Sequence, residues 1–146
     1  MQNADNPFTV LVDEYLESSL DSVDSCEEKT KDSALGIGFS EEDAYQVGYA
    51  VREALVNAVV HGNQYSANKR VRFVLSRSEH TLQIEIEDEG RGFSPDTQGD
   101  PLAEENLLNQ SGRGIMIIRA FVDELQIAAA PRGGTRMVMK KSIVAG

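Results

Sequence analysis

The sequence predicts an α+β fold, a two-layer sandwich in which a mostly antiparallel, mixed β-sheet carries its helices on one face. Two observations lead to this prediction. Strand patterns come in pairs joined by short connections, which is typical of hairpins. One long helical pattern has a single apolar face that must be buried against another layer. The chain of 146 residues has the length of one domain, so we expect residues 1–146 to form a single domain.

The first half predicts one strand and two helices. Residues 8–12 are rich in β-formers and predict a short strand. Residues 16–35 predict a helix with a weak apolar stripe, broken by the glycines that follow. Ser40 looks like the N-cap of the next helix, which ends near His61 with Gly62 as its cap. Its apolar face is made of residues at helical spacing: Ala44, Val47, Val51, Ala54, Leu55 and Ala58.

The second half predicts two hairpins with a helix between them. Residues 71–75 and 82–86 alternate between apolar and more polar side chains and read as an antiparallel hairpin. Residues 88–111 are rich in Gly, Pro, Asp and Asn, and a loop of this length is usually functional. A helix is predicted over 114–122. Two final strands, over 125–129 and 135–141, are joined by a Pro-Arg-Gly-Gly turn.

Composition excludes several classes of function. The chain has 24 acidic and 14 basic residues and a net charge of -10, which argues against direct binding to nucleic acid or to an anionic membrane. No apolar run approaches the roughly 18 residues of a membrane span, and the N-terminus lacks the pattern of a signal peptide. One cysteine, Cys26, and two histidines exclude an internal disulfide, a cysteine-rich zinc site and a multi-histidine metal site. We therefore expect a cytoplasmic protein.

The strongest candidate site residues lie on the helix after Ser40. Glu53, Asn57 and His61 are four residues apart, so an α-helix would place them on one face. A carboxylate there can act as a base, and an amide oxygen can ligate a hard cation such as Mg²⁺. Taken alone, the pattern also fits polar positions on an ordinary amphipathic helix.

Three glycine motifs follow in the second half. Asp88-Glu89-Gly90-Arg91-Gly92-Phe93 ends a strand, and its glycines would let the backbone approach a ligand closely. Ser111-Gly112-Arg113-Gly114-Ile115 opens a helix, where free N–H groups can cradle phosphate. Gly133-Gly134-Thr135 enters the last strand. Each motif alone is equally compatible with a simple turn or a helix cap.

Together, in this order, the four motifs resemble the Bergerat ATP-binding fold of gyrase, MutL and the histidine kinases. The run Glu-Ala-Leu-Val-Asn-Ala-Val-Val-His-Gly-Asn is similar to the anti-sigma-factor serine kinases of the SpoIIAB and RsbW type. The resemblance covers nearly the whole chain. It implies ATP/ADP and Mg²⁺ as ligands, an anti-anti-sigma (STAS) protein as substrate, a sigma factor as second partner, and a homodimer held through the N-terminal strand and helix.

The resemblance also implies a role for each matching residue. Glu53 matches the catalytic base and Asn57 the Mg²⁺ ligand, with His61 and Gly62 near the phosphates. Asp88 would bind the adenine amino group. The remaining nucleotide-binding positions are Gly90, Gly92 and Phe93 at the adenine, Gly112, Arg113, Gly114 and Ile115 at the phosphates, and Thr135 beside Asp88. Residues of about 94–111 would form the ATP lid.

Other functions remain open alternatives. A non-catalytic ATP-binding module that sequesters a regulatory partner would keep the same fold without needing Glu53. A free-standing histidine-kinase catalytic domain would need a phosphoacceptor helix ahead of the ATP fold, and neither His61 nor His80 precedes it. An ATPase clamp of the MutL or gyrase kind carries a further transducer domain, for which this chain has no room.

Overall fold

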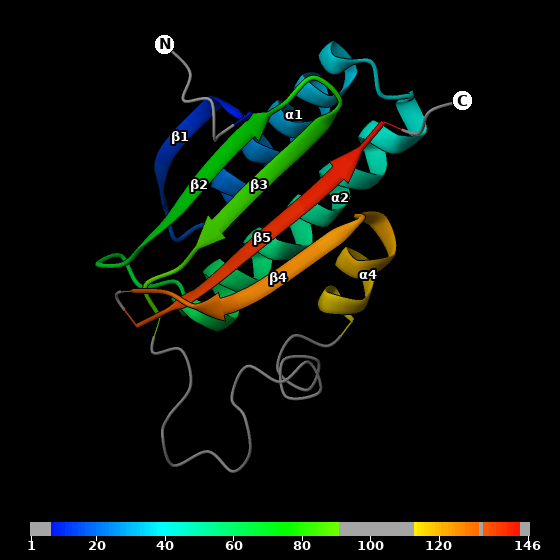
Figure 1. Cartoon of the computed structure of the whole chain (residues 1–146). Coiled ribbons are helices and arrows are strands. Elements are labelled where there is room, and N and C mark those ends of the chain that lie inside the picture. Colours follow the sequence, from blue (N-terminus) through cyan, green and yellow to red (C-terminus); the bar gives the residue numbers. More distant parts are fainter. Residues whose placement is uncertain (1–6, 91–112, 132, 144–146) are drawn as a thin grey trace.

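A computed structural model describes residues 7–90, 113–131 and 133–143. Five strands form one sheet in the order β1-β2-β3-β5-β4, and each of the four pairings in the described ranges is antiparallel. The strands are β1 (Thr9–Glu17), β2 (Arg70–Arg77), β3 (Thr81–Glu87), β4 (Glu124–Ala129) and β5 (Thr135–Ser142). Figure 1 shows this sheet in front of its helices, which all lie on one face. The predicted α+β sandwich is therefore confirmed.

The helical layer consists of α1 (Leu20–Ile37), α2 (Glu41–Val56), a π-helical segment η1 (Asn57–Gly62) that continues α2, and α4 (Gly114–Phe121). α2 packs between α1 and α4. Ser40 caps α2 as expected, because its side chain accepts a hydrogen bond from the N–H of Asp43 at 3.1 Å. In the described part of the chain, no helix is both long enough and apolar enough to cross a membrane.

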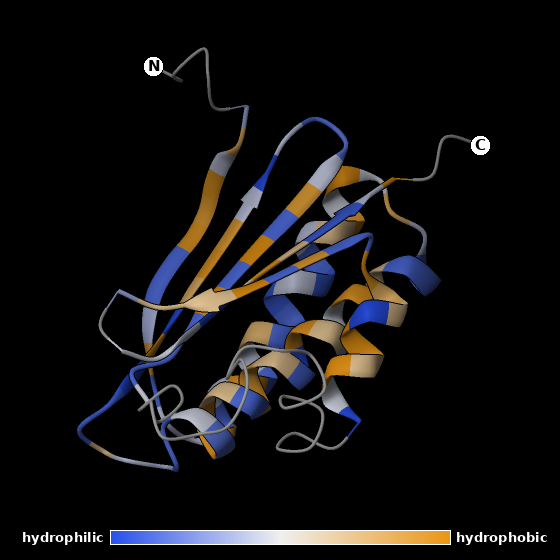
Figure 2. Cartoon of the chain, turned by 60° about the horizontal axis from the view of Figure 1, so that its bottom comes forward, coloured by the Kyte–Doolittle hydropathy of each residue, from blue (hydrophilic) through white to orange (hydrophobic). Residues whose placement is uncertain are grey.

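The core lies between the sheet and α2. On β2 and β3 the buried side chains face one another in register, with Phe73 opposite Ile86 and Leu75 opposite Ile84. Figure 2 shows the resulting alternation of hydrophobic and hydrophilic residues along these strands. The apolar residues of α2, including Val47, cover the same face of the sheet. The central hairpin and the amphipathic helix thus occupy the positions that their periodicities predicted.

The first strand is longer than predicted. β1 continues to Glu17, so the following helix begins at Leu20 rather than at residue 16. The inward-facing position between Val12 and Leu16 is Glu14, whose carboxylate accepts a hydrogen bond from Lys29 of α1 at 2.8 Å. An acidic residue at an inward position interrupts the apolar alternation, which is why the pattern suggested that the strand ended earlier.

The end of the long helix also differs from the prediction. Hydrogen bonding changes from α to π at Asn57, and the helical path ends at Asn63 rather than at a glycine cap. Gly62 does not adopt the left-handed conformation of a capping glycine in this structure. A glycine is needed here for another reason, because a side chain on residue 62 would clash with Asp88 at the end of β3.

Candidate nucleotide site

Glu53 and Asn57 come together at the beginning of α4. Both side chains face Gly114, the first residue of that helix, and a Cβ atom placed on Gly114 would lie 3.3 Å from Glu53 Oε2 and from both amide atoms of Asn57. A side chain at this position would press on both groups. A carboxylate and an amide therefore lie at the N-terminus of a helix, a combination that suits a ligand carrying phosphate and a metal ion.

Asn57 has an unsatisfied polar group at this position. The residue is 8% exposed, and within the described ranges its Nδ2 is the one buried side-chain nitrogen or oxygen without a hydrogen-bond partner. A buried donor left unpaired costs about 1–3 kcal/mol. In native proteins such a group calls for an explanation, and a ligand that is bound during function is one.

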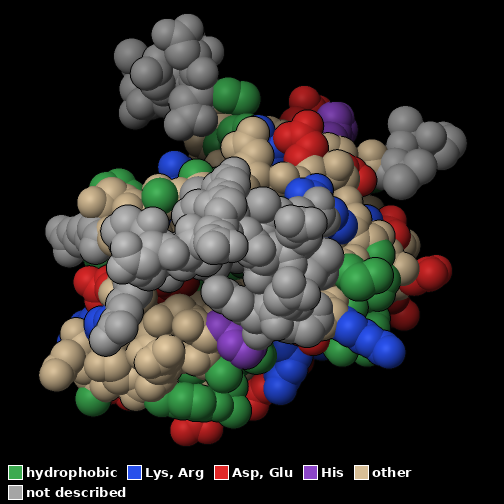
Figure 3. Space-filling view, turned by 90° about the horizontal axis from the view of Figure 1, so that it is seen from below, with side chains coloured by type: hydrophobic (Ala, Val, Ile, Leu, Met, Phe, Trp, Pro, Cys, Tyr) green, Lys and Arg blue, Asp and Glu red, His purple; other side chains and the backbone are tan. Residues whose placement is uncertain are grey.

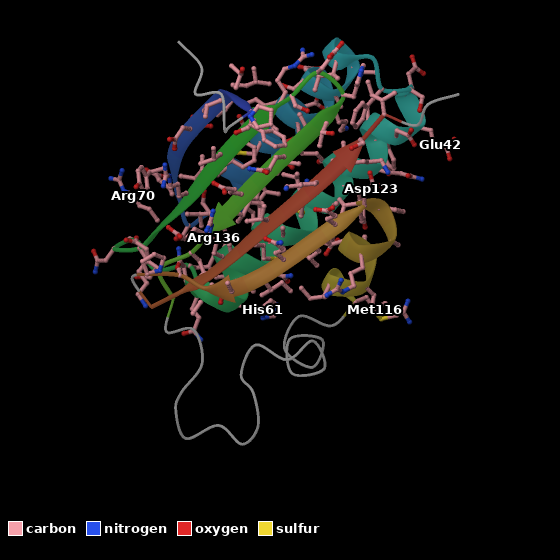
Figure 4. The ribbon with its side chains drawn as sticks, in the orientation of Figure 1. Glu42, His61, Arg70, Met116, Asp123 and Arg136 are labelled. Atoms are coloured by element: carbon pink, nitrogen blue, oxygen red, sulfur yellow. The ribbon has the colours of Figure 1, made fainter. Side chains whose placement is uncertain are left out.

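His61 differs from this pair in its exposure. The spacing of four predicts a shared face for Glu53, Asn57 and His61, and the hydrogen bonding changes to i→i+5 from Asn57 onward. His61 is exposed, whereas Asn57 is buried. In Figure 4 His61 projects from the lower end of the molecule, the same end as Met116 of α4 and opposite to Glu42.

Asp88 occupies a cage of glycines at the end of β3. A Cβ atom on Gly62 would lie 2.5 Å from the Asp88 carboxyl carbon, and one on Gly134 would clash with the Asp88 carbonyl oxygen. Gly90 is packed in the same way against the backbone of Gly62. Three segments that are distant in sequence therefore close around one carboxylate because none of them carries a side chain at the contact.

Two backbone groups fix the Asp88 carboxylate. Oδ1 accepts hydrogen bonds from the N–H of Gly90 at 2.9 Å and from the N–H of Thr135 at 3.1 Å. The side chain is only 6% exposed, and burial raises the pKa of the Asp88 carboxyl, with the two hydrogen bonds acting in the opposite direction. In the described part of the chain these bonds end on Oδ1, which leaves Oδ2 as the oxygen for an outside donor.

The structure describes only some of the other predicted positions. Arg113 is the exposed N-cap residue of α4, and Ile115 is fully buried in the core, where it holds that helix in place. Thr135 contacts Asp88 through its backbone, and its side chain is half-buried. Gly92, Phe93, Gly112 and the expected lid, residues 94–111, lie outside the described residues.

Asn63 ends the sequence run that begins at Glu53, and the sequence assigned it no role in the site. It is 1% exposed and binds three other segments of the chain through its amide group. The sequence places it directly after a His-Gly pair in a polar stretch, where an exposed turn residue is the ordinary expectation. Figure 3 shows this end of the molecule from below, with a histidine side chain at the surface and basic side chains near it.

Comparison with known proteins shows what the chain is similar to. Residues 16–141 match the model of the histidine kinase-like ATPase domain. An anti-sigma F factor of Clostridium perfringens strain SM101 is 31% identical over 104 residues, which cover 70% of this chain and 74% of that protein. The anti-sigma F factor of Clostridium novyi strain NT is 32% identical, over 70% of this chain and 73% of that protein.

A solved structure supports the fold independently. The RsbU and RsbW domains of Rv1364c from Mycobacterium tuberculosis match with a TM-score of 0.62 and 16% identity, over 94% of this chain and 32% of that one. The chain belongs to the histidine kinase-like ATPase family. Within that family it groups with the anti-sigma factor type, as the order of its motifs indicated.

Proposed function

We propose that this protein is an ATP-binding anti-sigma factor that also acts as a serine kinase on an anti-anti-sigma (STAS) protein. The observation that carries the proposal is the convergence of Glu53 and Asn57 on Gly114, 3.3 Å from a Cβ atom placed there. Family membership implies an adenine nucleotide. Phosphoryl transfer requires a base and a metal ligand beside the phosphates in addition to nucleotide binding, and Glu53 and Asn57 would supply these two groups.

The residues present fit Mg²⁺-ATP. Asn57 offers a buried amide with an unpaired Nδ2, and its Oδ1 is a suitable oxygen ligand for Mg²⁺, which favours sites completed by substrate phosphates. Asp88 offers a carboxylate oxygen to the adenine amino group at the other end of the site. Gly90 and Thr135 hold that carboxylate in one orientation. Gly112, Arg113 and Gly114 would surround the phosphates, with His61 and Gly62 at their edge.

Glu53 is the proposed base for the kinase step. Bound ATP supplies the phosphoryl group, and the serine oxygen of the partner forms the new bond to phosphorus as the bond to the ADP oxygen breaks. Glu53 accepts the proton that the serine hydroxyl loses. Because Glu53 Oε2 and the Asn57 amide lie equally close to the Gly114 position, the proton acceptor and the metal ligand address the same end of the nucleotide.

The names of the matching relatives motivate the proposed protein partners. Proteins named anti-sigma F factor match this chain, so a sigma factor is the proposed binding partner and a STAS protein its competitor and substrate. A homodimer through β1 and α1 and a cytoplasmic location belong to the same proposal. The edge position of β1 supports the dimer, since Val10, Leu11 and Tyr15 are exposed there. Light scattering that gives the monomer mass of 16.0 kDa at micromolar concentration would refute the dimer.

The test uses the STAS protein recovered by pull-down from the native host. Wild-type protein, Glu53→Gln and Asn57→Ala are each mixed with this partner and radiolabelled ATP, and the phosphate is located by mass spectrometry. We expect Glu53→Gln to bind ATP normally and to transfer phosphate about 10²–10⁴-fold more slowly. Asn57→Ala is expected to weaken Mg²⁺-dependent ATP binding and transfer together. A wild-type protein that binds ATP and partner but never transfers phosphate would establish the alternative, a non-catalytic ATP-binding module.

A further inference from the structure

We propose that Asn63 is the positioning residue that aims Asp88 at the adenine amino group and so sets how well the site distinguishes adenine from purines without that group. This inference rests on the proposed function, because it concerns the same nucleotide site. It adds a role for Asn63, the last residue of the run that begins at Glu53, to which the sequence analysis gave none. Asn63 acts without touching the ligand, through the backbone of Glu89, the residue next to Asp88.

The amide of Asn63 uses both of its donors and its acceptor. Nδ2 donates to Ser18 Oγ at 2.9 Å and to the carbonyl of Arg70 at 3.0 Å. Oδ1 accepts the N–H of Glu89 at 2.8 Å. Ser18 is itself fixed, because its hydroxyl donates to the carbonyl of Lys69 at 2.6 Å. A side chain held by three bonds at 1% exposure has one orientation available.

These contacts hold the peptide segment that carries Asp88 from one side. A second bond supports the same segment, because the Glu89 carboxylate accepts the N–H of Arg70 at 2.6 Å at the beginning of β2. Thr135 also holds Asp88, because its N–H donates to Asp88 Oδ1 and its carbonyl accepts the N–H of Asp88. We therefore infer that the direction of Oδ2 depends on Asn63 as well as on β5.

The turn that delivers Asn63 is strained, which is a separate observation. Gln64 and Tyr65 follow with φ values of 51° and 59°, in the left-handed region that side chains other than glycine rarely adopt. The turn is tied to η1, since the N–H of Tyr65 donates to the carbonyl of Val59 at 2.9 Å. Backbone strain persists only where surrounding contacts over-determine it, and it gathers at functional sites. Here the strained turn begins directly after Asn63, whose side chain bonds to Glu89 beside Asp88.

The experiment compares two nucleotides that differ by one group. Calorimetry with Mg²⁺ measures the dissociation constants of ADP and of purine riboside 5′-diphosphate, which lacks the amino group. We expect the wild type to prefer ADP at least tenfold. In Asn63→Ala that preference is expected to fall below threefold, with a smaller loss in the affinity for the purine analogue. Asn68→Ala is the matched control, because Asn68 lies in the same connection and is exposed, and it should keep the wild-type preference.

Three results would overturn the inference. If Asn63→Ala weakens both nucleotides by the same factor, Asn63 only supports the fold, while the proposed function stands. If the wild type binds no adenine nucleotide, the proposed function fails and this inference fails with it. Should Asn63→Ala not fold, Ser18→Ala removes one partner of the amide and replaces it in the comparison. We then expect a lower preference for ADP and faster exchange of the Glu89 amide proton by NMR, and an unchanged preference would refute the inference.

Discussion

Asp88 and Thr135 hold each other through three backbone groups and one carboxylate. The N–H of Asp88 donates to the carbonyl of Thr135 at 3.0 Å, and the N–H of Thr135 donates to Asp88 Oδ1 at 3.1 Å. The first bond continues the pairing of β3 with β5 beyond its last register pair, Glu87 with Arg136. The second bond fixes the Asp88 carboxylate at the end of β3, so the pairing of β3 with β5 helps to set the orientation of this side chain.

The first prediction concerns the charge of Asp88. Asp88→Asn keeps the size of the side chain but presents either a neutral oxygen or an NH₂ group to the adenine amine. Loss of a hydrogen bond to a charged acceptor corresponds to about 1.5–3 kcal/mol, or about 10–100-fold in affinity. Calorimetry with ADP and Mg²⁺ measures this change. Affinity equal to that of the wild type would show that Asp88 does not contact the base.

The second prediction concerns pH. Burial raises the pKa of Asp88, so its carboxylate becomes protonated at a higher pH than an exposed aspartate does as the solution is acidified. Because protonation removes the charged acceptor, ADP affinity should begin to fall at that higher pH. The Asp88→Asn variant lacks this titration, and subtracting its profile between about pH 7 and about pH 4 removes the contribution of the phosphates. Identical profiles for the two proteins would contradict the prediction.

The same raised pKa has an opposite consequence for stability. Between the usual pKa and the raised one, the folded protein holds a proton on Asp88 that the unfolded chain has lost. The contribution of this group to the free energy of unfolding therefore falls as pH rises through that window. Urea unfolding of ligand-free wild type and Asp88→Asn should show a stability difference that grows in favour of the variant with increasing pH.

The third prediction tests the glycine cage. A Cβ atom on Gly134 would overlap the carbonyl oxygen of Asp88, so Gly134→Ala forces the ends of β3 and β5 apart. We expect a loss of about 3 kcal/mol, at the upper end of the usual cost of overpacking. Gly36→Ala is the matched control, since Gly36 lies in α1 with nothing within 4 Å of its Cβ position. That control should gain about 0.5–1 kcal/mol from helix propensity.

The fourth prediction concerns Cys26 of α1. The thiol is fully buried, and burial, with a smaller contribution from Glu14, raises its pKa to about 11. The thiolate is the reactive form, so labelling of the folded protein near pH 8 should be at least about 100-fold slower than labelling of the unfolded chain. An Ellman assay with and without urea measures the ratio. Rapid labelling without urea would show that α1 opens readily from the sheet.

Much of the fold could be predicted from periodicity. The central hairpin and α2 are strongly patterned because each has one face in the core, as Phe73 and Val47 show. The extent of β1 was predicted wrongly because Glu14 faces inward and is neutralised by Lys29, a contact between separate elements. Local pattern contains no information about a partner in another element.

The site was predictable only in outline. Glu53, Asn57 and Asp88 stand in recognisable motifs, and their side chains do face the glycines that surround them. The role of Gly62 was misassigned, since its proximity to Asp88 follows from tertiary packing rather than from helix capping. The burial of Asn63 could not be inferred at all, because its partners are as far away in sequence as Ser18.

The π-helical segment holds one more residue than an α-helical path of the same rotation would need. An α-helix advances about 100° per residue, and an i→i+5 turn contains about one residue more than an i→i+4 turn. A deletion of one residue within Asn57–Gly62 that restored α-helical bonding would therefore leave the direction of the following chain almost unchanged. The change of helix type gives this connection between the metal-ligand position and the adenine-side loop a tolerance of one residue in length, which a purely α-helical connection would lack.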